Sequence, residues 1–178
     1  MEAPTRELYE LFESRTGGHI RRVVRNALGL VESGVVGESE YFPPAFIVER
    51  CVYHDISKWG FEEYVPYVWL TYFRSVGLGD DIPVGFREGI ERAIYHHVHT
   101  NRHHPEFFGE GLGCMGVLDI AEMVCDWAAV SQEFNSSLFD WVINTGFREY
   151  KFDKGQRRLI LEFAEVFEPR GEWRLALI

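Results

Sequence analysis

The chain has 178 residues, of which 46% are hydrophobic and 15% aromatic, and this is enough apolar material for one domain with its own core. Its formal charge of −10 opposes a broad binding surface for DNA or RNA, so no nucleic-acid partner is expected. No apolar run approaches the roughly 20 residues that a membrane span needs, and the first residues lack the basic and apolar regions of a signal peptide. We therefore expect a cytoplasmic protein without a membrane partner.

The first half of the chain reads as helices separated by glycine and proline. Apolar residues at helical spacing predict a short helix over residues 6–14, a break or kink at Gly17-Gly18, and a second helix that includes residues 20–31. A loop follows over residues 33–41. The prolines that come next start a third helix, which ends near Trp59-Gly60, because proline is tolerated in the first turn of a helix.

The second half continues in the same way, with no sustained period-2 alternation that would indicate a strand. The fold class is therefore all-α, a bundle of seven or eight helices in a single domain over residues 1–178. The segment from Thr100 through the glycines 109, 111 and 113 is the longest irregular stretch. The remaining helices are expected over residues 61–76, 84–99, 116–133, 137–150 and 154–167.

His54 and Asp55 stand side by side at the end of an apolar run. They offer a nitrogen and an oxygen donor of the kind that intermediate divalent metals take from proteins. Two donors do not hold a metal alone, so further donors must come from elsewhere in the chain.

Histidines are concentrated in one region, since five of the seven lie within residues 96–104. His97 continues the apolar face of its helix and is expected to point into the bundle, whereas His96 and His99 point elsewhere. The helix then runs into His103 and His104, which makes these residues candidate metal ligands together with His97. The alternative is that helix ends and loops simply collect polar aromatic residues, and that His97 is a satisfied core residue.

An aspartate stands in the apolar helix near residue 126. Asp119, Glu122 and Asp126 follow i, i+3, i+7 spacing, which places them on one helix face. Asp126 has apolar or small neighbours, and a carboxylate in such a place needs a cation or a hydrogen-bond partner. A metal is the functional interpretation; a buried salt bridge or an exposed polar stripe is the alternative.

Three basic residues lie close to these donors in the sequence. Lys58 follows Asp55 by three positions and could meet a phosphate oxygen, or it could be a surface cation favoured by a helix C-terminus. Arg22, one turn after His19, and Arg102, inside the histidine-rich segment, are further candidates for phosphate binding.

The order of these residues resembles the HD-domain superfamily of metal-dependent phosphohydrolases. His-Asp-Ile-Ser-Lys at residues 54–58 looks like the His-Asp-Ile-Gly-Lys variant of that family. The segments 93–106 and 120–129 are also similar to small HD-like proteins of phages and bacteria, and the resemblance covers about residues 15–150. It implies an HD-domain-like fold.

The resemblance also implies a ligand set, and it implies that Asp55 and Lys58 take part in catalysis. A second metal would use His97 and one of His103 and His104, with Asp55 bridging. The implied cofactor is one or two divalent ions of Mn, Fe, Co, Ni, Zn or Mg. The ligands implied for the first metal are His19, His54, Asp55 and Asp126.

The function implied is that of an enzyme, a phosphohydrolase that acts on a nucleotide or another small phosphoester by metal-activated water. Two features depart from known subclasses: Lys58 stands where the single-metal nucleotidases have a glutamate, and the glycine-rich signature of the cyclic-dinucleotide phosphodiesterases is missing. The alternatives are an HD-fold di-iron oxygenase and a non-catalytic binding module that contains a metal. The sequence leaves open whether the chain forms a homo-oligomer.

Overall fold

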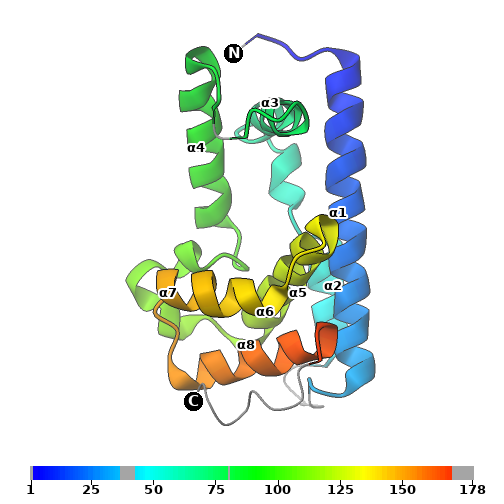
Figure 1. The fold of residues 1–178 in the computed structure, drawn as a ribbon, viewed down its shortest axis with the longest axis vertical. Coiled ribbons are helices and arrows are strands. Elements are labelled where there is room, and N and C mark those ends of the chain that lie inside the picture. The colour runs from blue at the N-terminus through cyan, green and yellow to red at the C-terminus, as the bar shows by residue number, and fades with distance from the viewer. Residues whose placement is uncertain (1, 37–42, 80, 170–178) are drawn as a thin grey trace. The chain divides into compact units, whose positions relative to one another are not determined.

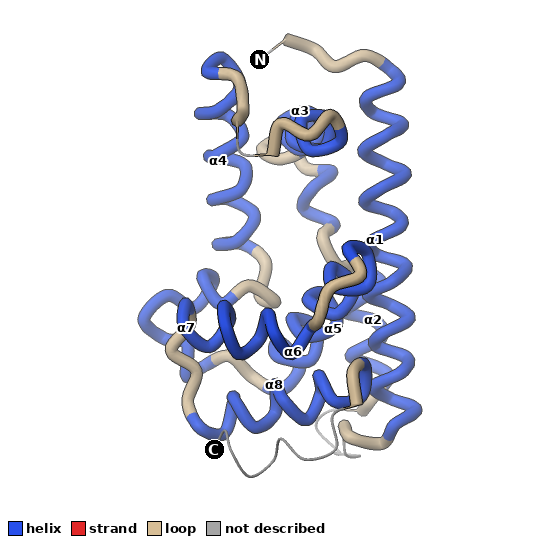
Figure 2. The backbone as a smooth tube through the Cα atoms, in the orientation of Figure 1, coloured by secondary structure: helices blue, strands red, loops and turns tan. Residues whose placement is uncertain are grey.

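The structure is a computed structural model, and it describes residues 2–36, 43–79 and 81–169. Every regular element in these ranges is a helix, which Figures 1 and 2 show, so the all-α prediction is confirmed for this part of the chain. None of the helices found there combines the length and the apolar character that a bilayer crossing requires.

Contacts between residues group the chain into two compact units, which are described separately below. The first unit comprises Met1–Gly18 and Asp55–Asn101, and the second comprises His19–His54 and Arg102–Ile178, each within its described residues. Each unit has its own apolar cluster. The single domain expected over the whole chain stays a prediction.

Helix α1 (Arg6–Ser33) is continuous, so the predicted break at Gly17-Gly18 is wrong. A glycine inside a helix costs only about 1 kcal/mol relative to alanine, and good helix formers on both sides outweigh two such positions. The helix is also held by burial on both sides of the glycine pair, because Phe12 and Val23 are fully buried.

The first unit is built around α3 (Tyr64–Ser75) and α4 (Val84–Thr100). Figure 1 shows α3 end-on beside α4, so the two helices cross steeply. Aromatic rings fill the crossing, with the ring centroids of Trp69 and Phe86 4.7 Å apart. Pro66 occupies the third position of α3, where its missing N–H has no helical partner to lose.

The second unit is built around α5 (Val117–Phe134), which is apolar on nearly all sides and therefore central. It packs against α2 (Ala45–Val52), α6 (Leu138–Trp141) and α8 (Lys154–Phe167), as Figure 1 shows for α8. A capping box between Asp153 and Gln156 fixes the start of α8 where the sequence predicts it.

Two predicted elements differ from the structure. The helix expected over residues 137–150 is divided into α6, a π-helical turn η3 (Val142–Gly146) and the short α7 (Phe147–Glu149). Trp141 packs on Trp127 there, with ring centroids 4.3 Å apart. A Cβ at Gly146 would lie 3.0 Å from the Trp141 ring, so that ring would have to shift to admit a side chain. The irregular stretch predicted after Thr100 contains 3-10 turns, η2 (Pro105–Cys114).

Candidate metal centre

The backbone changes direction at His54-Asp55. Helix α2 ends at Val52, and the 3-10 helix η1 (Ile56–Trp59) begins after Asp55, so the third helix is shorter than predicted. Asp55 has a left-handed conformation with φ 61° and ψ 13°. Aspartate tolerates this region better than most residues, and such positions concentrate at functional sites. The turn places His54 in the second unit and Asp55 in the first.

Within the second unit, His19 from α1, His54 and Asp126 from α5 come together. The Nε2 atom of His19 lies 2.9 Å from Asp126 Oδ1, and the Nε2 atom of His54 lies 3.6 Å from the same oxygen. The three donor atoms all lie within 4.8 Å of one another. Ligands at about 2.0–2.2 Å from one ion lie roughly 3–3.5 Å apart, so this set could hold a metal ion after small shifts of the side chains.

His19 and His54 stabilise the negative charge of Asp126. Burial would raise the pKa of the carboxyl, but hydrogen bonds from His19 and His54 hold the pKa of Asp126 well below its ordinary value. The side chains of His19 and Asp126 are each 14% exposed, and that of His54 is fully buried. The group is therefore an anion beside two imidazoles near neutral pH.

Glu122 lies one turn before Asp126, and its carboxylate faces the Nδ1 atoms of two histidines. Its Oε1 atom is 3.2 Å from His54 Nδ1 and 3.3 Å from His103 Nδ1. Its Oε2 atom accepts hydrogen bonds from Arg50 Nε at 3.0 Å and Arg50 Nη2 at 2.8 Å. Burial would raise the pKa of Glu122, but the hydrogen bonds from His103 and His54 hold that pKa far below its usual range.

A network of arginines and carboxylates continues from Glu122. Arg50 also donates to Asp119 Oδ1 at 2.8 Å, and Arg102 makes two bonds of 3.0 Å to the two oxygens of Asp119. The Arg102 guanidinium also lies over the Phe107 ring, 5.1 Å from its centroid. Asp119 and Glu122 are therefore buried members of an ion network, which agrees with the alternative of a buried salt bridge and not with that of an exposed stripe.

The first unit holds a second pair of donors. His97 is buried, as its place on the apolar face of α4 predicts, and its Nε2 atom lies 3.0 Å from Asp55 Oδ1. Lys58 Nζ lies 2.5 Å from Asp55 Oδ2 and 5.0 Å from the centroid of the Tyr67 ring. Lys58 is thus beside a candidate ligand instead of on a remote surface.

Glu63 is the central carboxylate of the first unit and was not singled out from the sequence. Glu63 is fully buried. Its carboxylate is hydrogen-bonded to His97 Nδ1 at 2.9 Å, to His96 Nδ1 at 2.7 Å and to the Ser57 hydroxyl at 3.0 Å. Burial would raise the pKa of Glu63, but the hydrogen bonds from His97 and His96 lower it. Burial would lower the pKa of His97, but its bonds to Asp55 and Glu63 raise that pKa.

The other predicted residues are placed as follows. The rings of His103 and His104 lie side by side in the second unit, with centroids 4.2 Å apart. Arg22 Nη2 lies 2.6 Å from Glu133 Oε2. The phosphate contacts predicted for Arg22 and Arg102 stay predictions, and both guanidinium groups are already paired with carboxylates.

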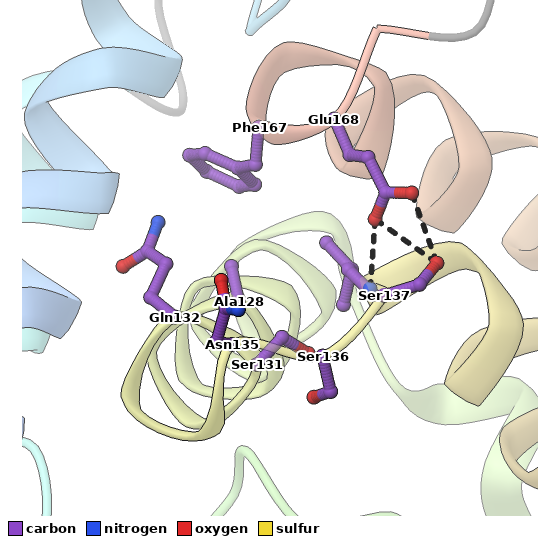
Figure 3. A pocket seen from close by; sticks show the side chains of 9 residues that line it. Ala128, Ser131, Gln132, Asn135, Ser136, Ser137, Phe167 and Glu168 are labelled. Atoms are coloured by element: carbon purple, nitrogen blue, oxygen red, sulfur yellow. Dashed lines mark hydrogen bonds between the residues drawn. The ribbon is translucent and has the colours of Figure 1, made fainter.

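A separate hollow of about 280 Å³ lies in the second unit, between the ends of α5 and α8 (Figure 3). Its lining includes the polar side chains of Gln132, Asn135 and Glu168. The Glu168 carboxylate accepts from the Ser137 hydroxyl at 2.9 Å and from the Leu138 N–H at 2.8 Å. Glu168 therefore caps the start of α6, and none of the predicted ligands lines this hollow.

The fold and the donors define the class: an all-α protein with buried histidine and carboxylate groups that could hold a metal ion. The chain belongs to a family of unknown function, DUF5662, which matches residues 9–166. Neither the curated proteins nor the solved structures give a match to this chain.

Proposed function

We propose that the protein is a metal-dependent phosphohydrolase that acts on a nucleotide or another small phosphoester, as its resemblance to the HD-domain superfamily suggests. The observation that carries the proposal is the donor set of His19, His54 and Asp126. Two imidazoles and one carboxylate suit manganese, iron, cobalt, nickel or zinc, and three protein ligands leave coordination positions open for water and substrate.

In this proposal, the candidate metal ligands are distributed over both units. His19, His54 and Asp126 hold the ion in the second unit, while Asp55 and His97 offer two further donors in the first. When bound, a divalent metal lowers the pKa of a coordinated water and neutralises the oxygens on phosphorus. Whether Asp55 joins the first ligand set, as the resemblance implies, stays a prediction.

Lys58 supplies a positive charge next to Asp55, at 2.5 Å. A lysine ammonium meets a phosphate as a point charge. The face of Tyr67, below the ammonium, holds the Lys58 side chain in place by a cation–π contact. We therefore assign substrate binding to Lys58 ahead of Arg22 and Arg102.

The same donor set supports a second candidate. Two histidines and one carboxylate with open positions are also typical of non-haem iron oxygenases. The identity of the metal and the products formed separate the two functions.

The test is to purify the protein, determine its metal content, and assay it with Mn, Co, Mg, Zn and Fe(II) against nucleotides and generic phosphoesters. We expect phosphate release that disappears in Asp126→Asn and persists in Glu162→Gln, a control at a half-buried carboxylate of α8 that pairs with Arg158. Iron with oxygen consumption and no phosphate release would favour the oxygenase. If no substrate of the panel releases phosphate, and Asp126→Asn has the same metal content as the wild type, the phosphohydrolase proposal is rejected.

A further inference from the structure

Both units contain a histidine that lies between two carboxylates. In the second unit, His54 has Glu122 near Nδ1, at 3.2 Å, and Asp126 near Nε2, at 3.6 Å. In the first unit, His97 has Glu63 near Nδ1, at 2.9 Å, and Asp55 near Nε2, at 3.0 Å. In both units, therefore, a glutamate lies at Nδ1 of the histidine and an aspartate lies at Nε2.

A neutral imidazole has one N–H and one lone pair, so it can satisfy only one of two carboxylates. The carboxylate that faces the lone pair is repelled unless a cation, either a second proton or a metal ion, lies between them. A metal ion at the lone-pair end of each histidine would remove this repulsion.

We propose that Glu122 and Glu63 are positioning residues: each accepts the Nδ1–H of a histidine, His54 or His97, and so turns the Nε2 lone pair toward the metal-binding aspartate. This inference rests on the proposed metal site and names the carboxylates that orient its ligands instead of binding the ion. A carboxylate on the far ring nitrogen fixes the tautomer and raises the basicity of a ligating histidine.

The two glutamates are already saturated by other donors, and this decides which end of each histidine takes the metal. Glu122 Oε2 accepts two bonds from Arg50, and its Oε1 lies near Nδ1 of both His54 and His103. A cation added at that end would meet the Arg50 guanidinium. Asp126 instead faces the Nε2 atoms of His54 and His19, and these nitrogen atoms can bind an ion together with the carboxylate.

The first unit shows the same division. Glu63 accepts from His96 and from the Ser57 hydroxyl in addition to His97, and Ser57 is in turn held by the Asn101 amide at 2.8 Å. Asp55 forms its ion pair with Lys58 through Oδ2 and keeps Oδ1 toward His97 Nε2.

The histidine tautomers can be read directly by long-range ¹H–¹⁵N NMR on the full chain, loaded with the diamagnetic ion Zn²⁺. We expect His54 and His97 to carry Nδ1–H and to bind zinc through Nε2, with assignments made from His54→Asn and His97→Asn. Zinc on Nδ1 with Nε2–H on either histidine, or no zinc binding at all, would overturn the inference. Zinc on Nε2 without turnover of any phosphoester would overturn only the proposed function.

Variants give a second measurement. Glu122→Gln and Glu63→Gln should each weaken zinc binding roughly 10–100-fold in a competition titration, since this is the usual effect of removing an outer partner. Asp119→Asn is the matched control, because Asp119 lies one turn before Glu122 and binds the same Arg50. Its other hydrogen-bond donors among the described residues are Arg102 and the Gly116 N–H. Weakening by Asp119→Asn equal to that by Glu122→Gln would show a merely structural role. The wild-type spectra decide the question if a glutamine variant fails to fold.

Discussion

His19 and Asp126 face each other across the second unit, with 2.9 Å between His19 Nε2 and Asp126 Oδ1. One residue comes from α1 and the other from α5, so only the tertiary fold brings them together. The contact joins an imidazole nitrogen to a carboxylate oxygen at a distance that suits two ligands of one ion.

The first prediction concerns metal binding by this pair. Saturating Mn²⁺ or Zn²⁺ should raise the melting temperature of the wild type, because an ion that binds only the folded state at 100 times its Kd adds about 2.7 kcal/mol. Asp126→Asn should abolish this increase, since the neutral amide is a poor ligand. Thermal denaturation with and without metal measures the effect, and Glu162→Gln should behave as the wild type. An unchanged increase in Asp126→Asn would exclude Asp126 as a ligand.

The second prediction concerns the pH dependence of stability at Asp119. Burial would raise the pKa of this carboxyl, but Arg102, the Gly116 N–H and Arg50 lower it. A carboxyl with a lowered folded pKa stabilises the protein above its unfolded pKa of about 3.9, and this contribution disappears as the pH falls through the folded value. The wild type should therefore exceed Asp119→Asn in free energy of unfolding at neutral pH.

Urea denaturation of the two proteins between neutral pH and pH 3 checks this. The difference in free energy of unfolding should be constant near neutrality and should shrink below about pH 4. A difference that grows toward acid pH would contradict the assigned ion network.

Part of the candidate site could be predicted because each residue has a local signal. Asp126 interrupts an apolar helix, and His97 continues an apolar face, so both were expected to point inward. Their side chains are 14% and 4% exposed. Glu63 has no such signal. It precedes a helix in a segment of mixed aromatic and acidic residues, and its role depends on His97, a residue from a different helix.

The fold was predicted to a similar degree. Helix α8 has matching caps and an apolar face, and its bounds agree with the prediction. The continuity of α1 through Gly17-Gly18 and the π-helical turn at Gly146 could not be read locally, because packing along α1 and against Trp141 and Trp127 decides them.

The third prediction concerns the cap shown in Figure 3. Glu168→Gln removes a negative charge from the N-terminus of α6, where the carboxylate accepts from the Leu138 N–H and the Ser137 hydroxyl. We expect a loss of about 0.5–2 kcal/mol in the free energy of unfolding, measured with urea. Metal affinity should stay unchanged, because Glu168 is not among the candidate ligands. A loss of metal binding in Glu168→Gln would link this cap to the metal centre and contradict the separation of the two.

The last prediction separates two effects of Lys58 on the proposed reaction. Its ammonium competes with a metal ion for Asp55, since Nζ lies 2.5 Å from Asp55 Oδ2. Lys58→Met keeps a flexible side chain of similar length and removes the charge. An ion pair of this kind contributes about 1 kcal/mol, so metal should bind roughly three- to tenfold more tightly in the variant. The KM for a phosphoester should rise instead, because the phosphate loses its point charge. Isothermal titration with Mn²⁺ and steady-state kinetics measure the two constants, and Lys58→Arg should restore the KM in part. Weaker metal binding in Lys58→Met would mean that Lys58 orients the Asp55 carboxylate and does not compete with the metal ion for it.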